Sequence, residues 1–146
     1  MRIAFACDHA GFPFREDILR YLATTQHKIL DLWPEKNDEL DDFPDYVAKV
    51  CSVIWHDADI GILVCGTGVG MSIAANRYRN IRAVLAYSPD VTKVSRSHND
   101  ANVICFGART MKLEDILESI GIFLTEPFLG GKYQKRNDKI GNICCL

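Results

Sequence analysis

Cys65 is the side chain in this sequence whose type and position are best suited to chemistry. It opens a turn that reads Cys-Gly-Thr-Gly-Val-Gly-Met-Ser over residues 65–72 and follows an apolar run that begins at Ile60. Glycines in such a turn let backbone N–H groups approach an anion at the start of the next helix. The same N–H groups favour a thiolate, which is the reactive form of cysteine. We therefore expect a thiolate base that removes a proton from carbon beside a phosphate-sized turn.

Other uses of this turn find little support in its residues. A dinucleotide fingerprint, G-x-G-x-x-G, would need glycine where Met71 stands, and no lysine follows as it does in a P-loop. The six cysteines form no C-x-x-C pair, and no H-E-x-x-H spacing is present. We therefore expect free thiols in a reducing compartment and no metal site.

Polar residues flank two other apolar runs. Asp8 and His9 directly follow the first run, Arg109 follows the last, and His98-Asn99-Asp100 precedes the last. Ligands of doubly wound sheets bind outside the carboxyl ends of the strands, where the strand order reverses. Asp8, His9 and the glycine turn should therefore converge, with Arg109 at the same end as either a surface charge or an anion clamp. His98 should lie toward the opposite end, as part of a polar turn or within reach of a neighbouring subunit's site.

The elements that position these residues alternate between strands and helices. Four runs are almost continuously apolar, as expected for strands buried on both faces of a parallel sheet: Ile3–Cys7, Ile60–Cys65, Arg82–Tyr87 and Asn102–Phe106. Lys28–Trp33 alternates more and suits a fifth strand nearer an edge. Apolar residues at helical spacing occupy 47–54 and 113–120, and Ser88-Pro89 is typical of a helix start. The pattern predicts an α/β sandwich with a flavodoxin-like strand order 2-1-3-4-5 and a crevice between the first and third strands.

Length and charge exclude several classes of protein. The 146 residues suit one domain, residues 1–146, and 48% hydrophobic with 25% charged residues is the profile of an ordinary globular protein. A formal net charge of -2 gives no global attraction to nucleic acid or to an anionic membrane, so an anionic substrate needs a local cluster of positive charge. No segment is long and apolar enough to span a bilayer, and the first residues lack a signal-peptide pattern, so we expect a cytoplasmic protein.

Two further stretches are defined by their charge. The acidic stretch from Glu35 to Asp45 is interpreted as a solvated loop that leads into a helix. Beyond Pro127, Gly130-Gly131 introduces a segment with a single acid and four basic residues, which are Lys132, Lys135, Arg136 and Lys139. This segment is either an exposed, frayed helix or an arm that carries positive charge to a phosphate.

Taken together, these residues resemble the ribose-5-phosphate isomerase B family, which also includes the bacterial galactose-6-phosphate isomerase subunits. The collinear motifs that carry the resemblance run over almost the full chain. They are Cys7–Gly11, Asp42–Tyr46, Cys65–Gly70 with Ser72–Asn76, Ile81–Ala83, Ser95-Arg96 with His98–Val103, Phe106–Arg109 and Gly130-Gly131. The resemblance implies a Rossmann-like three-layer α/β/α sandwich with a five-stranded parallel sheet and a C-terminal helical arm. It also implies a homodimer whose sites are shared between the subunits, sometimes paired into a homotetramer.

The activity that the resemblance implies is the interconversion of ribose 5-phosphate and ribulose 5-phosphate, in the non-oxidative branch of the pentose phosphate pathway, without metal or organic cofactor. Cys65 is then the base that moves a proton between C2 and C1 through a cis-enediolate. Asp8 and His98 assist opening of the furanose ring, with His98 acting in the partner's site. Thr67 and the amides of the turn stabilise the enediolate oxygen, and these amides belong to Gly66, Gly68, Val69 and Gly70.

The resemblance also implies how the rest of the substrate is held. The phosphate is surrounded by His9, Arg109, Lys132 and Arg136, while Asn99 contacts sugar oxygens. Some members of the family use a glutamate base at the place that Met71 occupies here. Because methionine cannot accept a proton, this chain resembles the members with a cysteine base.

Two alternatives to ribose 5-phosphate remain open. Lys132 stands where many family members have arginine, and lysine offers a point charge in place of a bidentate fork. A six-carbon phosphate such as galactose, tagatose or allose 6-phosphate is therefore the second candidate substrate. The third candidate is a binding module of flavodoxin-like shape that senses a sugar phosphate without turning it over. Cys65 argues against this module, because a pure binder has no need of a thiol beside the turn.

Overall fold

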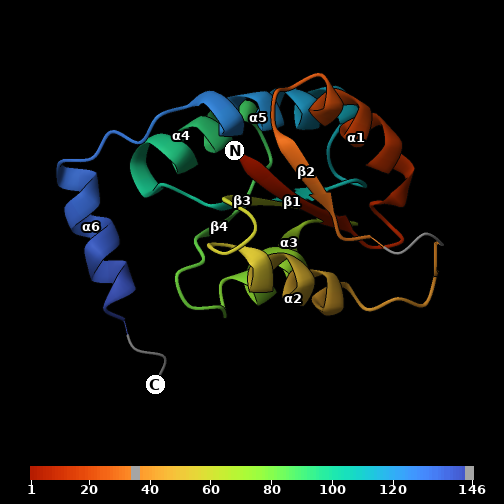
Figure 1. Cartoon of the computed structure of the whole chain (residues 1–146), viewed down its shortest axis with the longest axis horizontal. Helices are drawn as coiled ribbons and strands as arrows, with labels where there is room; N and C mark the ends of the chain where they lie inside the picture. The colour runs from red at the N-terminus through yellow and green to blue at the C-terminus, as the bar shows by residue number, and fades with distance from the viewer. Residues whose placement is uncertain (34–36, 144–146) are drawn as a thin grey trace.

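One parallel sheet of five strands forms the centre of the molecule, with helices on both faces (Figure 1). The computed structural model describes residues 1–33 and 37–143. The strands are β1 (Arg2–Cys7), β2 (Lys28–Asp31), β3 (Ile60–Cys65), β4 (Ala83–Leu85) and β5 (Val103–Gly107). Burial is almost unbroken along β1, β3 and β5, as strands covered on both faces require.

The strands are ordered β2-β1-β3-β5-β4, so the expected order 2-1-3-4-5 is wrong at its last two positions. Burial explains the exchange. Every residue of β5 is buried, which suits a strand with a neighbour on each side. β4 has three residues, each partly buried, which suits a short strand at the edge of the sheet. The order still reverses between β1 and β3, so the switch point at which a crevice is expected is retained.

Helices form a layer on each face of the sheet. α1 (Arg15–Ala23), α4 (Pro89–Asn99) and α5 (Leu113–Thr125) cover one face, and α2 (Phe43–Val53) and α3 (Val69–Ala75) cover the other (Figure 1). The helical spacing in the sequence falls on buried faces, since Val50 of α2 and Ile116 and Ile120 of α5 are fully buried. The expected cap of α4 is also confirmed, because Ser88 Oγ accepts the N–H of Val91 at 3.3 Å. The three layers expected from the sequence are therefore present.

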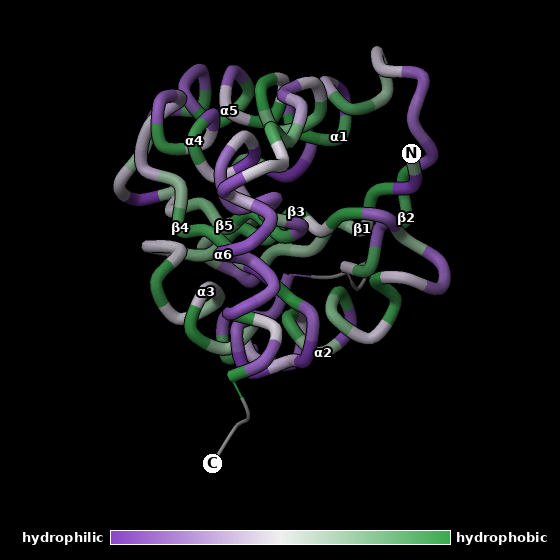
Figure 2. Tube along the Cα trace, turned by 90° about the vertical axis from the view of Figure 1, so that its left-hand side faces the viewer, coloured by the Kyte–Doolittle hydropathy of each residue, from purple (hydrophilic) through white to green (hydrophobic). Residues whose placement is uncertain are grey.

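α6 (Lys132–Gly141) stands apart from these layers, beyond the end of α4 (Figure 1). Figure 2 shows hydrophilic residues along most of its length, and Asn137 is the residue of this helix that is buried. The N–H of Leu129 donates to the carbonyl of Ser97 at 3.0 Å, which ties the segment before α6 to α4. The C-terminal helical arm is therefore anchored at its base and polar beyond it.

The described cysteines are Cys7, Cys51, Cys65 and Cys105, and all four are free thiols, as expected. Cys144 and Cys145 lie outside the described residues, as does Glu35 at the start of the acidic stretch. Within residues 1–33 and 37–143, none of the helices has the length and apolar character that crossing a membrane requires.

Candidate active site

Cys65 is the last residue of β3, and its thiol is held by the turn that follows. The N–H of Gly68 donates to Cys65 Sγ at 3.1 Å, and the residue is 5% exposed. Gly68 has a φ of +75°, and a Cβ there would lie 2.6 Å from Leu85 Cδ1 and 3.0 Å from the carbonyl carbon of Phe106. Both the left-handed backbone and the lack of space require glycine at this position. The glycine turn therefore fixes the place of the sulfur.

The other three described cysteines lie in the core, where burial acts on the pKa of each thiol. Burial raises the pKa of Cys51 to about 11, and it also raises the pKa of Cys7 and of Cys105. These three thiols stay protonated at neutral pH and fill space in the core. Cys65 is the described thiol that opens on the glycine turn.

Asp8 lies directly beyond the carboxyl end of β1, the strand next to β3. Its N–H donates to the carbonyl of Val64 at 3.1 Å, which places it beside the start of the thiol turn. Its Oδ1 accepts the N–H groups of Ala10 and Gly11 at 2.9 and 3.0 Å, and the residue is 5% exposed. Burial raises the pKa of this carboxyl, while the two N–H donors oppose the rise. Such a carboxyl is suited to exchanging protons with a ligand.

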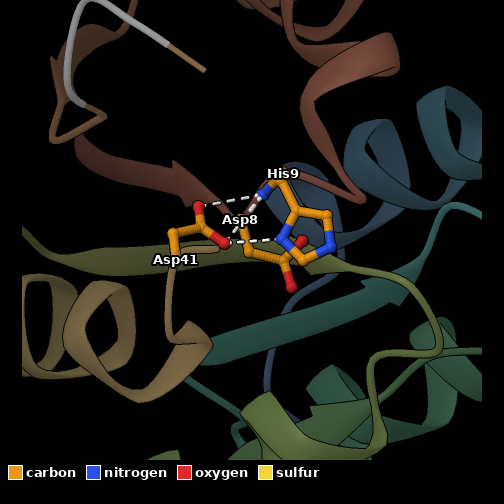
Figure 3. A group of neighbouring side chains, drawn as sticks. All are labelled: Asp8, His9 and Asp41. Carbon is orange, nitrogen blue, oxygen red and sulfur yellow. Dashed lines mark hydrogen bonds and ion pairs between the residues drawn. The ribbon is translucent and has the colours of Figure 1, made fainter. Parts of the chain in front are cut away.

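His9, the next residue, is held by Asp41 from the loop before α2 (Figure 3). The backbone N–H of His9 donates to Asp41 Oδ2 at 3.0 Å, and His9 Nδ1 lies 2.6 Å from Asp41 Oδ1. The hydrogen bond with Asp41 raises the pKa of His9, as does the nearby charge of Asp8. The Asp41 side chain is only 6% exposed, so the acidic stretch is not a fully solvated loop, which corrects the expectation from the sequence. Asp41 faces inward, where two donors of His9 and the hydroxyl of Tyr46 meet it.

Asp8, His9 and Asp41 form a group with the potential to hold a metal ion, since one ligand atom from each lies within 4.8 Å of the others. The geometry favours a different interpretation. His9 Nδ1 and the Asp41 carboxylate are bonded to each other, and Asp8 Oδ1 already accepts two N–H groups. We therefore interpret the three side chains as a hydrogen-bonded group and not as metal ligands.

Arg109 reaches the same crevice because β5, and not β4, lies beside β3. The N–H groups of Ala108 and Arg109 donate to the carbonyls of Cys65 and Gly66 at 2.8 and 2.9 Å. A Cβ on Gly66 would lie 3.4 Å from Arg109 Nη1 and 3.6 Å from Ala10 Cβ, so the guanidinium packs over the turn beside the segment that carries His9. The strand order that differs from the expected one is therefore what brings Arg109 against the turn.

The remaining residues of the turn lead into α3. Thr67 is exposed, and its Oγ1 accepts the N–H of Val69 at 3.4 Å. The ring of Phe43 packs on Gly70, where a Cβ would lie 2.7 Å from Phe43 Cζ. In the part of the chain that the structure describes, the N–H groups of Gly70 and Met71 meet no carbonyl acceptor, as is usual in the first turn of a helix. The turn therefore offers backbone donors beside the thiol.

A second set of candidate residues gathers around the ring of Tyr133. His98 stacks on this ring with centroids 4.0 Å apart and an interplanar angle of 9°. Lys132 Nζ and Arg136 Cζ lie 5.1 and 5.7 Å from the ring centroid, and Asn99 is exposed at the end of α4. Tyr133 was not among the residues singled out in the sequence. The signal for it was an aromatic residue between basic residues on a polar helix.

The candidate residues form two groups. The crevice group, at the carboxyl ends of β1, β3 and β5, consists of Asp8, His9, Asp41, Cys65, residues 66–70 and Arg109. The arm group, on α6 and on the end of α4 that runs back toward the amino end of β5, consists of His98, Asn99, Lys132, Tyr133 and Arg136. Among the described residues, no hydrogen bond or ion pair joins one group to the other. A single protomer therefore does not assemble these residues into one site.

The fold and the crevice group together define an α/β protein whose strand ends are arranged to hold an anion and to transfer protons. The model of the family described as Ribose/Galactose Isomerase matches residues 3–140 of the chain. The chain belongs to this family.

Relatives and solved structures agree with this membership over nearly the whole chain. Ribose-5-phosphate isomerase B of Escherichia coli (strain K12) is 39% identical over 145 residues, which cover 97% of this chain and 95% of that protein. A crystal structure of ribose 5-phosphate isomerase from Thermotoga maritima is 43% identical with a TM-score of 0.91, and the match covers 97% of this chain and 98% of that one. Ribose-5-phosphate isomerase B from Mycoplasma genitalium, with bound ribulose-5-phosphate, is 37% identical with a TM-score of 0.91 over 96% of this chain and 93% of that one. The resemblance and the Rossmann-like fold inferred from the sequence are confirmed.

Proposed function

We propose that this protein is a ribose-5-phosphate isomerase, which interconverts D-ribose 5-phosphate and D-ribulose 5-phosphate. The observation that carries the proposal is the Cys65 thiol at the end of β3, held by the Gly68 N–H in the same crevice as Asp8. Membership of the ribose/galactose isomerase family supports an aldose–ketose isomerase that acts on a phosphorylated sugar. The relative from Mycoplasma genitalium with bound ribulose-5-phosphate supports the five-carbon substrate.

Transfer of a proton between carbons needs a base and a stabilised oxyanion. In the proposed reaction, Cys65 as thiolate takes the proton from C2 of the open aldose. The C–H electron pair forms the C1–C2 double bond, and O1 gains the negative charge. A proton passes from O2 to O1, the C2 carbonyl forms, and the thiol returns its proton to C1. The N–H groups of Gly70 and Met71 and the Thr67 hydroxyl are the donors for the enediolate, and one such donor is commonly worth about 100- to 1000-fold in rate.

A ribose ring must open before this transfer. Asp8 is suited to take the proton of the C1 hydroxyl, because burial raises the pKa of its carboxyl. In the proposal, His98 of the partner subunit gives a proton to the ring oxygen at the same time. This role for His98 explains why a histidine stacked on Tyr133 lies away from the crevice of its own protomer.

The charge of the crevice supports a shared site. Within one protomer, two carboxyl groups lie beside two basic side chains, and these four residues are Asp8, Asp41, His9 and Arg109. A phosphate with about two negative charges therefore needs further positive charge. The exposed basic residues of the arm group supply it when the arm of one subunit reaches the crevice of another. We accordingly propose a homodimer with two equivalent shared sites, placed in the cytoplasm, where free thiols stay reduced.

The proposal is tested by the isomerisation of ribose 5-phosphate with excess chelator, for the native chain and for Cys65→Ala. We expect chelator-insensitive turnover by the native chain and a fall in kcat of about 1000-fold or more in the variant, because the base is lost. Cys51→Ala removes a buried thiol of the α2 face and serves as the control, with near-native turnover.

Each other outcome rejects a defined part of the proposal. Turnover of galactose or allose 6-phosphate without turnover of ribose 5-phosphate would replace the substrate. Tight binding of sugar phosphates without turnover of any would reject the enzyme in favour of a binding module. Full activity of Cys65→Ala would reject the proposed base.

A further inference from the structure

Asp41 touches no reacting atom in the proposed reaction, yet it is the acid of residues 37–45 that is not exposed. Its side chain is 6% exposed, whereas Asp42 next to it is exposed and makes no side-chain cap bond at the start of α2. Burying a carboxylate is costly unless donors meet it. The groups that donate hydrogen bonds to Asp41 therefore indicate its role.

Two of the donors belong to His9, and the third is the hydroxyl of Tyr46 on α2, whose pKa is raised by burial and by its hydrogen bond to Asp41. The backbone N–H of His9 donates to Asp41 Oδ2 at 3.0 Å, and Nδ1 lies 2.6 Å from Oδ1 (Figure 3). A carboxylate only accepts hydrogen bonds, so Nδ1 must carry the hydrogen. The pair of bonds fixes the ring orientation and the tautomer together, as second partners of histidine do in other sites.

This arrangement leaves Nε2 as the ring atom that is available to a ligand. Figure 3 shows Nε2 on the side of the ring away from Asp41, and the His9 side chain is 32% exposed. Within the described residues, His9 Nε2 has no hydrogen-bond partner. The charged groups that act on the ring are Asp41, Asp8 and Arg109. The Arg109 guanidinium packs over Gly66 beside Ala10, so Nε2 and Arg109 belong to the same end of the crevice.

We propose that Asp41 is a positioning residue for substrate binding: it holds the His9 ring so that Nε2, which carries a hydrogen in the imidazolium, faces the phosphate. This inference rests on the proposed function, in which His9 contacts that phosphate. Asp41 then acts on the substrate through His9 and affects binding of the phosphate more than the proton transfer at carbon.

The sign of the pH effect follows from the charges. Asp41 raises the pKa of His9, so the imidazolium, with both nitrogens as donors, persists to higher pH. Removal of the Asp41 charge returns the pKa of His9 toward the ordinary value of about 6.5, against the lowering effect of Arg109. Binding that depends on the imidazolium is present below the pKa of His9 and is lost as the pH rises through it. The loss should therefore begin at lower pH in a variant without the carboxylate.

The first experiment compares Asp41→Asn with Asp42→Asn, a matched control that removes the same charge from the adjacent exposed position. With excess chelator, KM of Asp41→Asn for ribose 5-phosphate should rise about 3- to 10-fold at pH 8 and less at pH 6, with kcat nearly unchanged. Asp42→Asn should match the native chain at both pH values. Equal KM values for Asp41→Asn and the native chain across this range would overturn the inference.

The second experiment follows the His9 ring directly, in the free protein. Long-range proton–nitrogen NMR spectra report the tautomer and the titration of each histidine, and His9→Gln identifies the signals of His9. We expect Nδ1–H and a raised pKa for His9 in the native chain, and a lower pKa in Asp41→Asn but not in Asp42→Asn. An unchanged titration in Asp41→Asn would overturn the inference. Where Asp41→Asn folds poorly, Asp41→Glu replaces it, with a smaller shift of the same sign expected.

The third experiment separates action through His9 from a general structural effect. If Asp41 acts through His9, adding Asp41→Asn to His9→Gln should raise KM by less than about 2-fold beyond His9→Gln alone. A full additional rise would mean that Asp41 acts elsewhere. A native chain that isomerises nothing would reject the proposed function instead, while the NMR experiment would still decide whether Asp41 holds His9.

Discussion

The crevice group and the arm group are held in place by different means. The three principal residues of the crevice group, Cys65, Asp8 and Arg109, are positioned by backbone: each lies at or just beyond the end of a strand, and main-chain hydrogen bonds link these strand ends. The arm group is positioned by the ring of Tyr133, on a helix that stands apart from the three layers. A protomer thus carries the crevice group on its sheet and the arm group around a partly buried aromatic stack.

This difference shows what each half contributes. The proposed base, its neighbouring donors and Asp8 need fixed distances, which a parallel sheet supplies within one chain. In the proposal, the histidine and the cations of the arm act on a ring oxygen and a phosphate, for which long side chains on a docked helix suffice. We therefore expect changes at Cys65, Asp8 and the turn to lower kcat and changes in the arm to raise KM, with His98 as the exception in the arm. His9 and Asp41 are the exceptions in the crevice, since they are proposed to act on the phosphate.

The largest effect should come from two substitutions placed on different subunits, one at Cys65 and the other at His98. Cys65→Ala and His98→Asn should each lose about 1000-fold or more in kcat, because each removes one proton-transfer group from both sites of the dimer. A mixture refolded or co-expressed at equal amounts forms hybrid dimers in which one site has both native groups. We expect recovery of about a quarter of the native activity in the mixture.

The control mixes the two variants without subunit exchange. We expect no recovery of activity in that mixture. If the exchanged mixture regains no activity, Cys65 and His98 act within one protomer, and the assignment of the two groups to different subunits is wrong.

Smaller effects are expected from alanine substitutions of glycine, and they should differ between the turn after Cys65 and the base of the arm. Gly68→Ala places a Cβ at a φ of +75°, 2.6 Å from Leu85 Cδ1 and 3.0 Å from the Phe106 carbonyl carbon. We expect a loss of about 2–4 kcal/mol in the free energy of unfolding and about a 100-fold fall in kcat, because the donor to the Cys65 sulfur moves. Denaturant titration and steady-state kinetics measure the two quantities.

Gly130→Ala is the matched control at the base of the arm. Its φ is +63°, but a Cβ there meets nothing within 4 Å. It should therefore cost only the backbone strain, about 1 kcal/mol, and leave kcat near native. Equal losses at the two glycines would contradict the view that packing fixes the crevice and not the arm.

The smallest effect should come from the aromatic ring of the arm. Tyr133→Leu removes the stack on His98 and the ring under Lys132 and Arg136, so we expect kcat/KM to fall about 3- to 10-fold. Tyr133→Phe keeps the ring and should stay within about 2-fold of native. A large loss in Tyr133→Phe, with Tyr133→Leu no worse, would point to the hydroxyl instead of the ring.

The parts of the molecule that could be predicted from the sequence are those set by local pattern. The unbroken apolar runs at 3–7 and 60–65 predict the buried strands β1 and β3, and the glycines after Cys65 predict the turn. The position of His98 away from the crevice also follows from chain order, because a helix must run back before β5 begins. These inferences need no knowledge of which strands are neighbours.

The parts that could not be predicted depend on contacts between distant residues. The runs that became β4 and β5 look alike in length and apolar content, so their order is decided by burial in the assembled sheet. Asp41 sits among exposed acids, and the donors that turn it inward lie 32 residues earlier in the chain. Tyr133 lies on a polar helix, where an aromatic residue is usually unremarked until its stacking partner on α4 is known.

The position of β5 between β3 and β4 also sets an order of events as the chain is made. β1, β2 and β3 are adjacent in the sheet and can pair once residue 65 has left the ribosome. Among the described strands, β4 pairs with β5 and no other, so it emerges before its partner and must wait for it. Until β5 arrives, the open edge of β3 and the carbonyl of Cys65 lack the partners that Gly107 and Ala108 later provide. The nascent enzyme therefore completes its thiol turn late, and agents that shield strand edges or thiols during synthesis would act on this interval.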